Sequence, residues 1–149
     1  MKKTFTQKEI PTLAREILAL LKPGTSATVV ALSGELGAGK TTLSQAIARE
    51  LGITENVISP TFVIMKSYGI SNKPKKLKAN KLIHIDAYRL NSHQELSKLG
   101  WTELVADPKN LILIEWPERV AKLIPHNAYE VSLSHLGEND REISLTKKP

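Results

Sequence analysis

The spacing of apolar residues predicts a helix, a strand and a second helix in the first third of the chain. Residues 8–22 repeat apolar positions at the interval of a helix with one buried face, and Pro11 suits its first turn. Residues 27–33 are apolar and β-branched, as in a buried strand, whereas residues 42–51 lack Gly and Pro and are rich in helix formers. The apolar positions of the first helix are Ile10, Leu13, Ile17, Leu20 and Leu21.

The middle of the chain has the pattern of a hairpin followed by a broken helix. Apolar runs at residues 62–68 and 81–86 predict two antiparallel strands, and the segment 72–80 between them is polar and strongly basic. Residues 92–104 then favour a helix, which the pair Gly100-Trp101 interrupts.

The last third predicts a central strand and a second hairpin. Residues 111–114 are four consecutive large aliphatic residues followed by Glu115, a pattern typical of a buried parallel strand. A proline just after this strand favours a helix over residues 118–123. Residues 128–134 and 142–146 alternate apolar and polar positions on either side of a turn, which predicts a β-hairpin that closes one edge of the sheet.

A glycine-rich motif lies between the first predicted strand and its helix. Residues 34–42 read Gly-Glu-Leu-Gly-Ala-Gly-Lys-Thr-Thr and fit G-x-x-x-x-G-K-[ST], in the strand-to-helix context that a P-loop requires. The glycines allow backbone N–H groups to point inward, and the helix N-terminus adds partial positive charge. Lys40 can reach the β- and γ-phosphates, and the Thr41 hydroxyl is the expected Mg²⁺ ligand. We therefore expect nucleoside triphosphate binding.

Length and composition limit the architecture and the setting. With 149 residues and 41% hydrophobic content, the chain suits one α/β domain, 1–149, built as three layers with a mixed central sheet between helices. No apolar run reaches membrane-spanning length, no signal peptide is visible, and the lack of cysteine fits a cytoplasmic protein. The four histidines show no metal-ligand spacing, and the formal charge of +6 weakly favours an anionic partner such as RNA.

Two acidic residues end apolar strands and compete for a role at the metal ion. We favour Glu115 for holding Mg²⁺ opposite Thr41, because the strand that it ends is uniformly apolar, as a central parallel strand should be. Asp86 ends a similar strand and is a candidate for positioning the attacking water or a Mg²⁺-bound water.

Two further segments have competing interpretations. Ser59-Pro60-Thr61 places two hydroxyl groups beside a restrained backbone and could sense the γ-phosphate as a switch loop, although an ordinary turn is the simpler interpretation. The lysines of residues 72–80 could contact RNA phosphates, but no aromatic residue is interleaved among them, which favours a solvated loop.

Several classes of P-loop protein can be compared with the chain. A GTPase needs an N-K-x-D motif, and Asn72-Lys73-Pro74-Lys75 lacks the acid. A small-molecule kinase usually clamps its acceptor with several arginines, and the five arginines here are scattered. The kinase remains an alternative, beside a non-catalytic nucleotide sensor and a slow ATPase that drives a partner's conformational cycle.

The motifs, taken in order, resemble those of one family. G-E-L-G-A-G-K-T-T, S-P-T-F, I-D-A-Y-R-L and a strand ending in E-W-P-E are together similar to the TsaE (YjeE) family over nearly the whole chain. The resemblance implies a small bacterial ATPase that acts with the TsaD and TsaB proteins. Together, the proteins of this system would form N6-threonylcarbamoyladenosine at position 37 of ANN-decoding tRNAs. The ATPase would then contact tRNA only indirectly, and its hydrolysis of ATP would reset the complex between turnovers.

The resemblance also implies roles for individual residues. Thr41 and Glu115 would hold Mg²⁺, Lys40 and Asp86 would act at the γ-phosphate or the attacking water, and the switch-loop role would fall to Thr61. Trp116 would lie at the nucleotide or partner face. The residues expected to bind ATP are Leu36, Gly37, Ala38, Gly39, Lys40, Thr41, Thr42, Trp116 and Arg141. Adenine contacts near the first helix would come from Thr6 or Gln7.

Overall fold

The structure is a computed structural model that describes residues 1–35, 37–55, 57, 64–72 and 76–147. Its strands are β1 (Lys2–Phe5), β2 (Thr28–Gly34), β3 (Met65–Gly69), β4 (Lys81–Asp86), β5 (Asn110–Glu115), β6 (Tyr129–His135) and β7 (Arg141–Lys147). Its α-helices are α1 (Ile10–Leu20), α2 (Lys40–Glu50), α3 (His93–Lys98) and α4 (Trp101–Ala106), and its 3₁₀ helices are η1 (Gln7–Glu9) and η2 (Pro117–Leu123).

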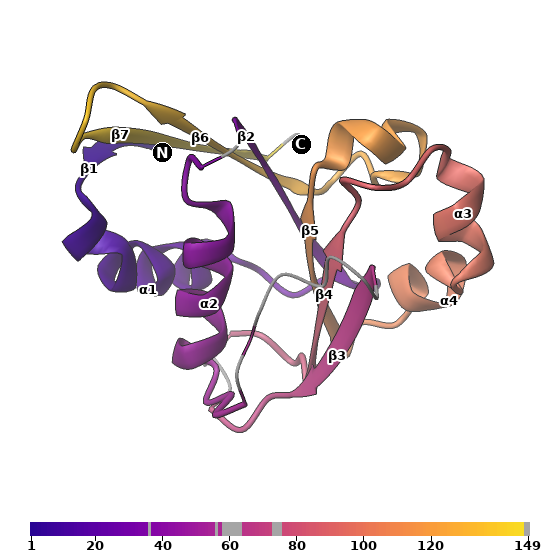
Figure 1. Cartoon of the computed structure of the whole chain (residues 1–149). Coiled ribbons are helices and arrows are strands. Elements are labelled where there is room, and N and C mark those ends of the chain that lie inside the picture. Colours follow the sequence, from indigo (N-terminus) through magenta and orange to yellow (C-terminus); the bar gives the residue numbers. More distant parts are fainter. Residues whose placement is uncertain (36, 56, 58–63, 73–75, 148–149) are drawn as a thin grey trace.

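The described strands form a mixed seven-stranded sheet in the order β1-β7-β6-β2-β5-β4-β3 (Figure 1). The inner strands β6, β2, β5 and β4 run parallel to one another, and β1, β7 and β3 are antiparallel to their neighbours. Strand β5 lies between β2 and β4, and all six of its residues are buried. The expected central position of the strand that ends in Glu115 is therefore confirmed.

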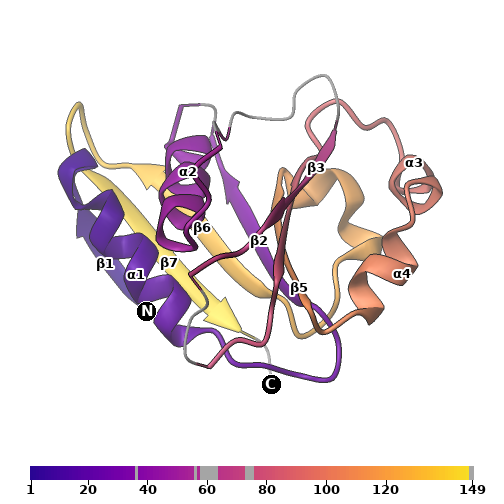
Figure 2. The ribbon, with the colours of Figure 1, turned by 90° about the horizontal axis from the view of Figure 1, so that it is seen from below.

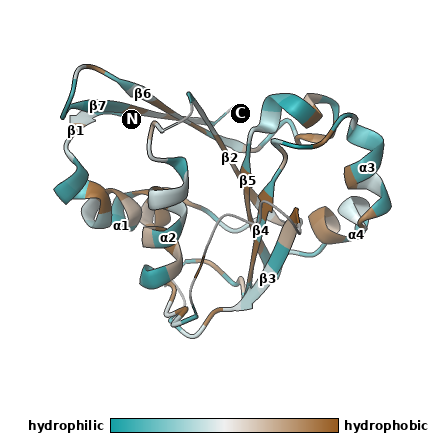
Figure 3. Cartoon of the chain, in the orientation of Figure 1, coloured by the Kyte–Doolittle hydropathy of each residue, from teal (hydrophilic) through white to brown (hydrophobic). Residues whose placement is uncertain are grey.

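Helices cover both faces of the sheet and give the expected three-layer α/β fold (Figures 1 and 2). Alternating strand residues divide between two cores, because successive side chains of a strand point to opposite faces. One core joins the sheet to α1 and α2, and the other joins it to α3, α4 and η2. The hydropathy colours show brown over much of β4 and β5 and teal on β7 (Figure 3). In the part of the chain that is described, no helix is long and apolar enough to cross a bilayer.

The first strand of the sheet was not predicted from the sequence. Strand β1 pairs with β7, so the β6–β7 hairpin is internal and the prediction that it closes the sheet edge is wrong. Of the four residues of β1, only Phe5 is buried, at 2% exposure. So short a strand with one buried side chain shows almost no alternation of apolar and polar residues. The strand forms because it pairs with a segment that is distant in the sequence.

The predicted helices are confirmed with changes at their ends. Pro11 lies in the first turn of α1, but Leu20 is 43% exposed, whereas Ala14 and Leu18 are buried. Leu20 lies to one side of the buried stripe of α1, which continues through Leu18 to Leu21, and this leaves its side chain in solvent. The segment after Trp116 is the 3₁₀ helix η2, and it is kinked at Val120, whose dihedral angles are not helical.

The broken helix and the first hairpin agree with expectation. Gly100, at φ +88°, separates α3 from α4, and β3 pairs antiparallel with β4. Strand β3 begins at Met65, later than expected. The described residues do not include Leu36, the S-P-T-F motif with Thr61, or residues 73–75 of the basic segment. The roles expected of Leu36 and Thr61 therefore stay predictions.

Candidate nucleotide site

The P-loop leaves β2 at a point where only glycine fits. Gly34 has φ +143°, and a Cβ atom there would lie 2.5 Å from the carbonyl oxygen of Leu133 on β6. Gly39, at φ +108°, is the N-cap of α2, a left-handed conformation that side chains disfavour. The backbone conformations of Gly34 and Gly39 place the P-loop at the carboxyl end of the parallel strands. The N-terminus of α2 points toward the same end of the sheet.

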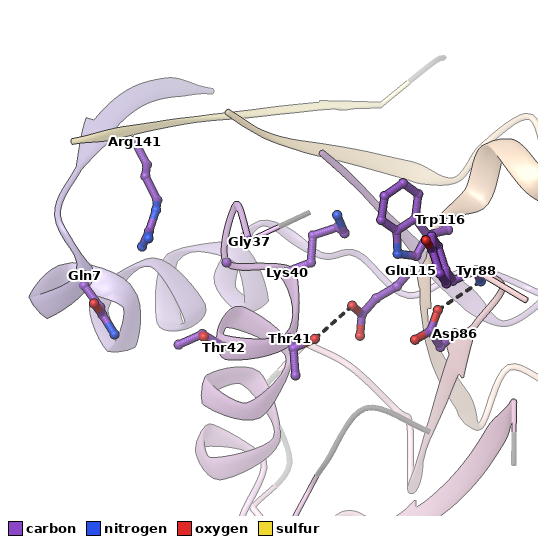
Figure 4. Close-up of a pocket in the computed structure, with 11 residues that line it drawn as sticks. Gln7, Gly37, Lys40, Thr41, Thr42, Asp86, Tyr88, Glu115, Trp116 and Arg141 are labelled. Atoms are coloured by element: carbon purple, nitrogen blue, oxygen red, sulfur yellow. Dashed lines mark hydrogen bonds between the residues drawn. The ribbon is translucent and has the colours of Figure 1, made fainter. Parts of the chain in front are cut away.

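A pocket of about 320 Å³ lies at this N-terminus. Residues from five parts of the fold line it: η1, the P-loop with α2, the end of β4 with the segment after it, the end of β5 with the residue after it, and the start of β7 (Figure 4). The lining residues are Gln7, Gly37, Gly39, Lys40, Thr41, Thr42, Asp86, Tyr88, Glu115, Trp116 and Arg141. The volume is within the range of small-molecule sites.

The charged side chain of Lys40 is buried and is held by hydrogen bonds to the P-loop backbone. Its ammonium group donates to the carbonyl oxygens of Gly34 and, at 3.1 Å, of Glu35. The same Nζ atom lies 4.0 Å from the centre of the Trp116 ring, a cation–π contact. Burial lowers the pKa of Lys40 below its ordinary value, and the carboxylates of Glu115, Glu118 and Asp86 oppose that shift without cancelling it.

Two oxygen ligands suited to Mg²⁺ face each other across the pocket. The Thr41 hydroxyl at the first turn of α2 donates to Oε1 of Glu115 over 3.2 Å (Figure 4). Glu115 is only 2% exposed, and its Oε2 lies 2.6 Å from Nε2 of His84. Hydroxyl and carboxylate oxygens are the donors that Mg²⁺ prefers, with water and phosphate completing its shell. Among the described residues, no group of three or more His, Asp or Glu side chains is arranged to hold a metal ion, so these two ligands fit a nucleotide-bound Mg²⁺ better than a cage made of protein alone.

The wall beside β4 and β5 is aromatic and acidic. The backbone N–H of Tyr88 donates to Oδ1 of Asp86 over 3.0 Å, which orients that carboxylate at the end of β4. The Tyr88 and Trp116 rings lie 5.0 Å apart between centroids, tilted by 51°. Trp116 has φ +60°, uncommon for a residue with a side chain. Such strain is often stored at functional sites, and here the conformation places Trp116 over Lys40.

The opposite wall comes from the two ends of the chain. Arg141 begins β7 and points toward the P-loop, with Nη1 3.9 Å from where a Cβ of Gly39 would lie. Gln7 on η1 lines the same side of the pocket beyond Thr42 (Figure 4). The pocket therefore has cationic and amide groups on one side and carboxylates on the other.

Comparisons with known proteins identify the family. The family model described as Threonylcarbamoyl adenosine biosynthesis protein TsaE matches residues 4–143. The chain belongs to the TsaE family. It is 34% identical to the Bacillus subtilis tRNA threonylcarbamoyladenosine biosynthesis protein TsaE, over 97% of this chain and 83% of that protein. It is 35% identical to the protein of the same name from Nostoc sp., over 98% of this chain and 86% of that protein.

A solved structure agrees with the fold. The crystal structure of YdiB from Bacillus subtilis superposes with a TM-score of 0.74 at 29% sequence identity, covering 99% of this chain and 84% of that one. The family resemblance inferred from the motifs and the P-loop α/β fold class are therefore both confirmed.

Most of the residues expected at the site of this TsaE-family chain do line one pocket. The structure brings together Gly37, Gly39, Lys40, Thr41, Thr42, Asp86, Glu115, Trp116 and Arg141. Ala38 is not among the lining residues, and its side chain is buried in the core at 1% exposure; the phosphate contact expected from its backbone stays a prediction. Gln7 lines the pocket, whereas the alternative Thr6 does not appear among the lining residues.

Two residues of the site carried no predicted role. Tyr88 lies two positions after Asp86 and lines the pocket with it. His84 was noted only as one of four scattered histidines, yet it contacts Glu115. It is a polar residue inside an apolar strand, two residues before Asp86 and so on the same face of β4. A polar residue in an apolar strand, on the same face as Asp86, was the feature of the sequence that indicated a role for His84 at the site.

Proposed function

We propose that this TsaE-family protein binds ATP with Mg²⁺ in the P-loop pocket and hydrolyses it slowly. We further propose that it does so with TsaD and TsaB, in the threonylcarbamoylation of adenosine 37 of ANN-decoding tRNAs. The observation that carries the ATP site is the pairing of the Thr41 hydroxyl with the Glu115 carboxylate beside Lys40, at the N-terminus of α2. The relatives' names carry the tRNA pathway, and the family resemblance carries the two partners.

Each group of the pocket has a task in this proposal. The P-loop N–H groups and Lys40 bind the β- and γ-phosphates. Thr41 and Glu115 would hold Mg²⁺, which neutralises charge on the phosphate oxygens. Asp86, oriented by the N–H of Tyr88, positions a water molecule for attack on the γ-phosphorus while the bond to ADP breaks. Arg141 adds positive charge on the opposite wall, and Trp116 shields Lys40 from solvent.

Lys40 changes partners when ATP binds. Its ammonium now donates to Gly34 and Glu35, and a phosphate oxygen offers a stronger, charge-assisted acceptor. We therefore expect the cation–π contact with Trp116 to be altered by nucleotide, so that tryptophan fluorescence reports binding.

Titration calorimetry with ATP tests the site, with and without Mg²⁺. Lys40→Ala should abolish detectable binding, whereas the exposed Lys66→Ala, away from the pocket, should bind as the wild type does. Glu115→Gln keeps the side-chain shape and should lose Mg²⁺-dependent turnover while the fold survives. If both pocket variants bind and hydrolyse ATP like the wild type, the assigned site is wrong.

The same samples separate two other functions. A small-molecule kinase would release ADP faster when a hydroxyl-bearing acceptor is added, and would yield a phosphorylated product. A non-catalytic sensor would bind ATP tightly without turnover, even beside its partner. Slow turnover without an acceptor is the result that our proposal predicts.

A further inference from the structure

A buried histidine lies behind the carboxylate of Glu115. His84 on β4 pairs in register with Leu113 on the neighbouring parallel strand β5, two residues before Glu115. His84 and Glu115 therefore leave the sheet on the same face, and Nε2 of His84 lies 2.6 Å from Oε2 of Glu115. The two side chains are 1% and 2% exposed. Because water hardly reaches this hydrogen bond, it is not weakened by competition with solvent.

The two oxygens of Glu115 consequently have different surroundings. Oε2 lies against His84 inside the protein, while Oε1 faces the Thr41 hydroxyl at the pocket, 3.2 Å away. A carboxylate accepts hydrogen bonds and cannot donate them. The imidazole of His84 therefore donates from Nε2, and the hydroxyl of Thr41 donates from the other side. One oxygen is fixed from behind and the other is presented to the site.

We propose that His84 is a positioning residue that holds Glu115 in the orientation required to bind Mg²⁺. His84 does not line the pocket, so it acts only through Glu115. A free glutamate side chain would have to give up rotamer freedom when it binds the ion, whereas this one is already ordered. The inference rests on the proposed metal site and goes beyond it by assigning a role to a residue outside the pocket.

Among the described residues, Glu115 is the one hydrogen-bond partner of the His84 side chain. Its Nδ1 atom is buried and has no hydrogen-bond partner there. A replacement therefore needs to supply only one N–H group, at the position of Nε2. The amide nitrogen of glutamine reaches about as far as Nε2, whereas the amide of asparagine is one methylene shorter. His84→Gln and His84→Asn thus form a matched pair that differ in reach and share the same chemistry.

The affinity of a non-hydrolysable ATP analogue, measured by calorimetry in saturating Mg²⁺ and again in EDTA, tests the proposal. The ratio of the two affinities reports the contribution of the metal ion. We expect His84→Asn to lower this ratio roughly tenfold to a hundredfold, the usual effect of removing a partner behind a metal ligand. His84→Gln should stay near the wild-type ratio, and the affinity in EDTA should not change in either variant. Leu82→Ala, a buried change two residues earlier on the same face of β4, should destabilise the protein and leave the ratio unchanged.

The outcomes distinguish this inference from the proposed function. Equal ratios for the asparagine and glutamine variants, or an equal loss in Leu82→Ala, would overturn the role of His84 alone. A wild-type protein that binds the analogue equally well in Mg²⁺ and EDTA would overturn the proposed metal site, and this inference with it.

A measurement on the wild type keeps the proposal testable if His84→Asn does not fold. In protein with ¹⁵N-labelled histidine, NMR should show His84 protonated at Nε2, with a hydrogen that exchanges slowly with solvent. Both properties should persist when the analogue and Mg²⁺ are added, because Oε2 stays with His84. An unprotonated Nε2, or loss of the slow hydrogen in the complex, would contradict the proposal.

Discussion

At the scale of single residues, Lys40 has its charge where solvent hardly reaches it. The side chain is 6% exposed and its ammonium group is held by two P-loop carbonyl groups and the Trp116 ring. Burial lowers its pKa even though three carboxylates raise it. Phosphate groups would stabilise the protonated form far more strongly than these neighbours do, so the state of this lysine should be linked to nucleotide binding.

We predict that ATP binding takes up a proton at alkaline pH. At a pH between the lowered pKa of Lys40 in the free protein and its higher pKa in the complex, Lys40 is deprotonated in the free protein and protonated in the complex. Affinity should therefore fall as pH rises through the free-protein pKa, below the ordinary lysine value of about 10.4. Calorimetry in two buffers of different ionisation enthalpy measures the uptake. Lys40→Arg, which stays protonated, should show none; equal uptake in both proteins would contradict the assignment.

Asp86 offers a second prediction at the same scale. If it positions the attacking water, Asp86→Asn should reduce the rate of hydrolysis by roughly a hundredfold or more, as expected when a group that assists proton movement or water placement is lost. ATP affinity should change little, because the phosphates bind to the P-loop. A variant that loses binding and turnover together would place Asp86 in nucleotide binding instead.

At the scale of elements, the connection from β2 to α2 depends on a close approach between backbones. Gly34 lies against the carbonyl group of Leu133 on β6, since β2 and β6 pair in parallel at this point. A side chain here would push the P-loop away from the sheet.

Gly34→Ala should therefore lower the free energy of unfolding by about 1–3 kcal/mol, the usual cost of forcing a strained backbone conformation. Nucleotide affinity should fall with it, because the loop would shift. Gly69→Ala is the matched control: it has ordinary dihedral angles and nothing within 4 Å of the added methyl group. Chemical denaturation of both variants provides the comparison, and equal stability would argue against the close approach.

Strand β1 gives another test at this scale. Phe5 is its one buried side chain and packs into the core with α1 and β7. Phe5→Ala should cost about 3–5 kcal/mol, as removal of a buried aromatic side chain does, whereas Lys2→Ala on the exposed face should be nearly neutral. Urea unfolding curves measure both. A small effect of Phe5→Ala would mean that β1 contributes little to the fold.

The sequence predicted the elements whose signal is local. The P-loop with its strand and helix, the apolar β5, the β3–β4 hairpin and the break at Gly100 all follow from spacing and residue type, and the structure confirms them. Strand β1 and the internal place of β7 could not be predicted, because they depend on pairing between the two ends of the chain. For the same reason the sequence showed the positions of Asp86 and Glu115 but not the contact of His84 with Glu115, which exists only once β4 and β5 are aligned.

At the scale of the whole molecule, the sheet separates two packed layers and places the pocket at one end of its parallel strands. The walls of the pocket come from η1, the P-loop, the ends of β4 and β5, and β7, so the wall that Gln7 and Arg141 form is complete only when η1 and β7 are folded onto the sheet. A partner that contacts β7 or the aromatic pair Tyr88 and Trp116 could therefore change the site directly.

Phosphate release from ATP in the presence of Mg²⁺, measured for the protein alone and with the TsaD–TsaB complex, tests the account most directly. We predict slow release by the protein alone, clear stimulation by the complex, and no release above background when Lys40→Ala replaces the wild type. Release by Lys40→Ala at the wild-type rate, or bound ATP that is never hydrolysed with or without the complex, would contradict the account.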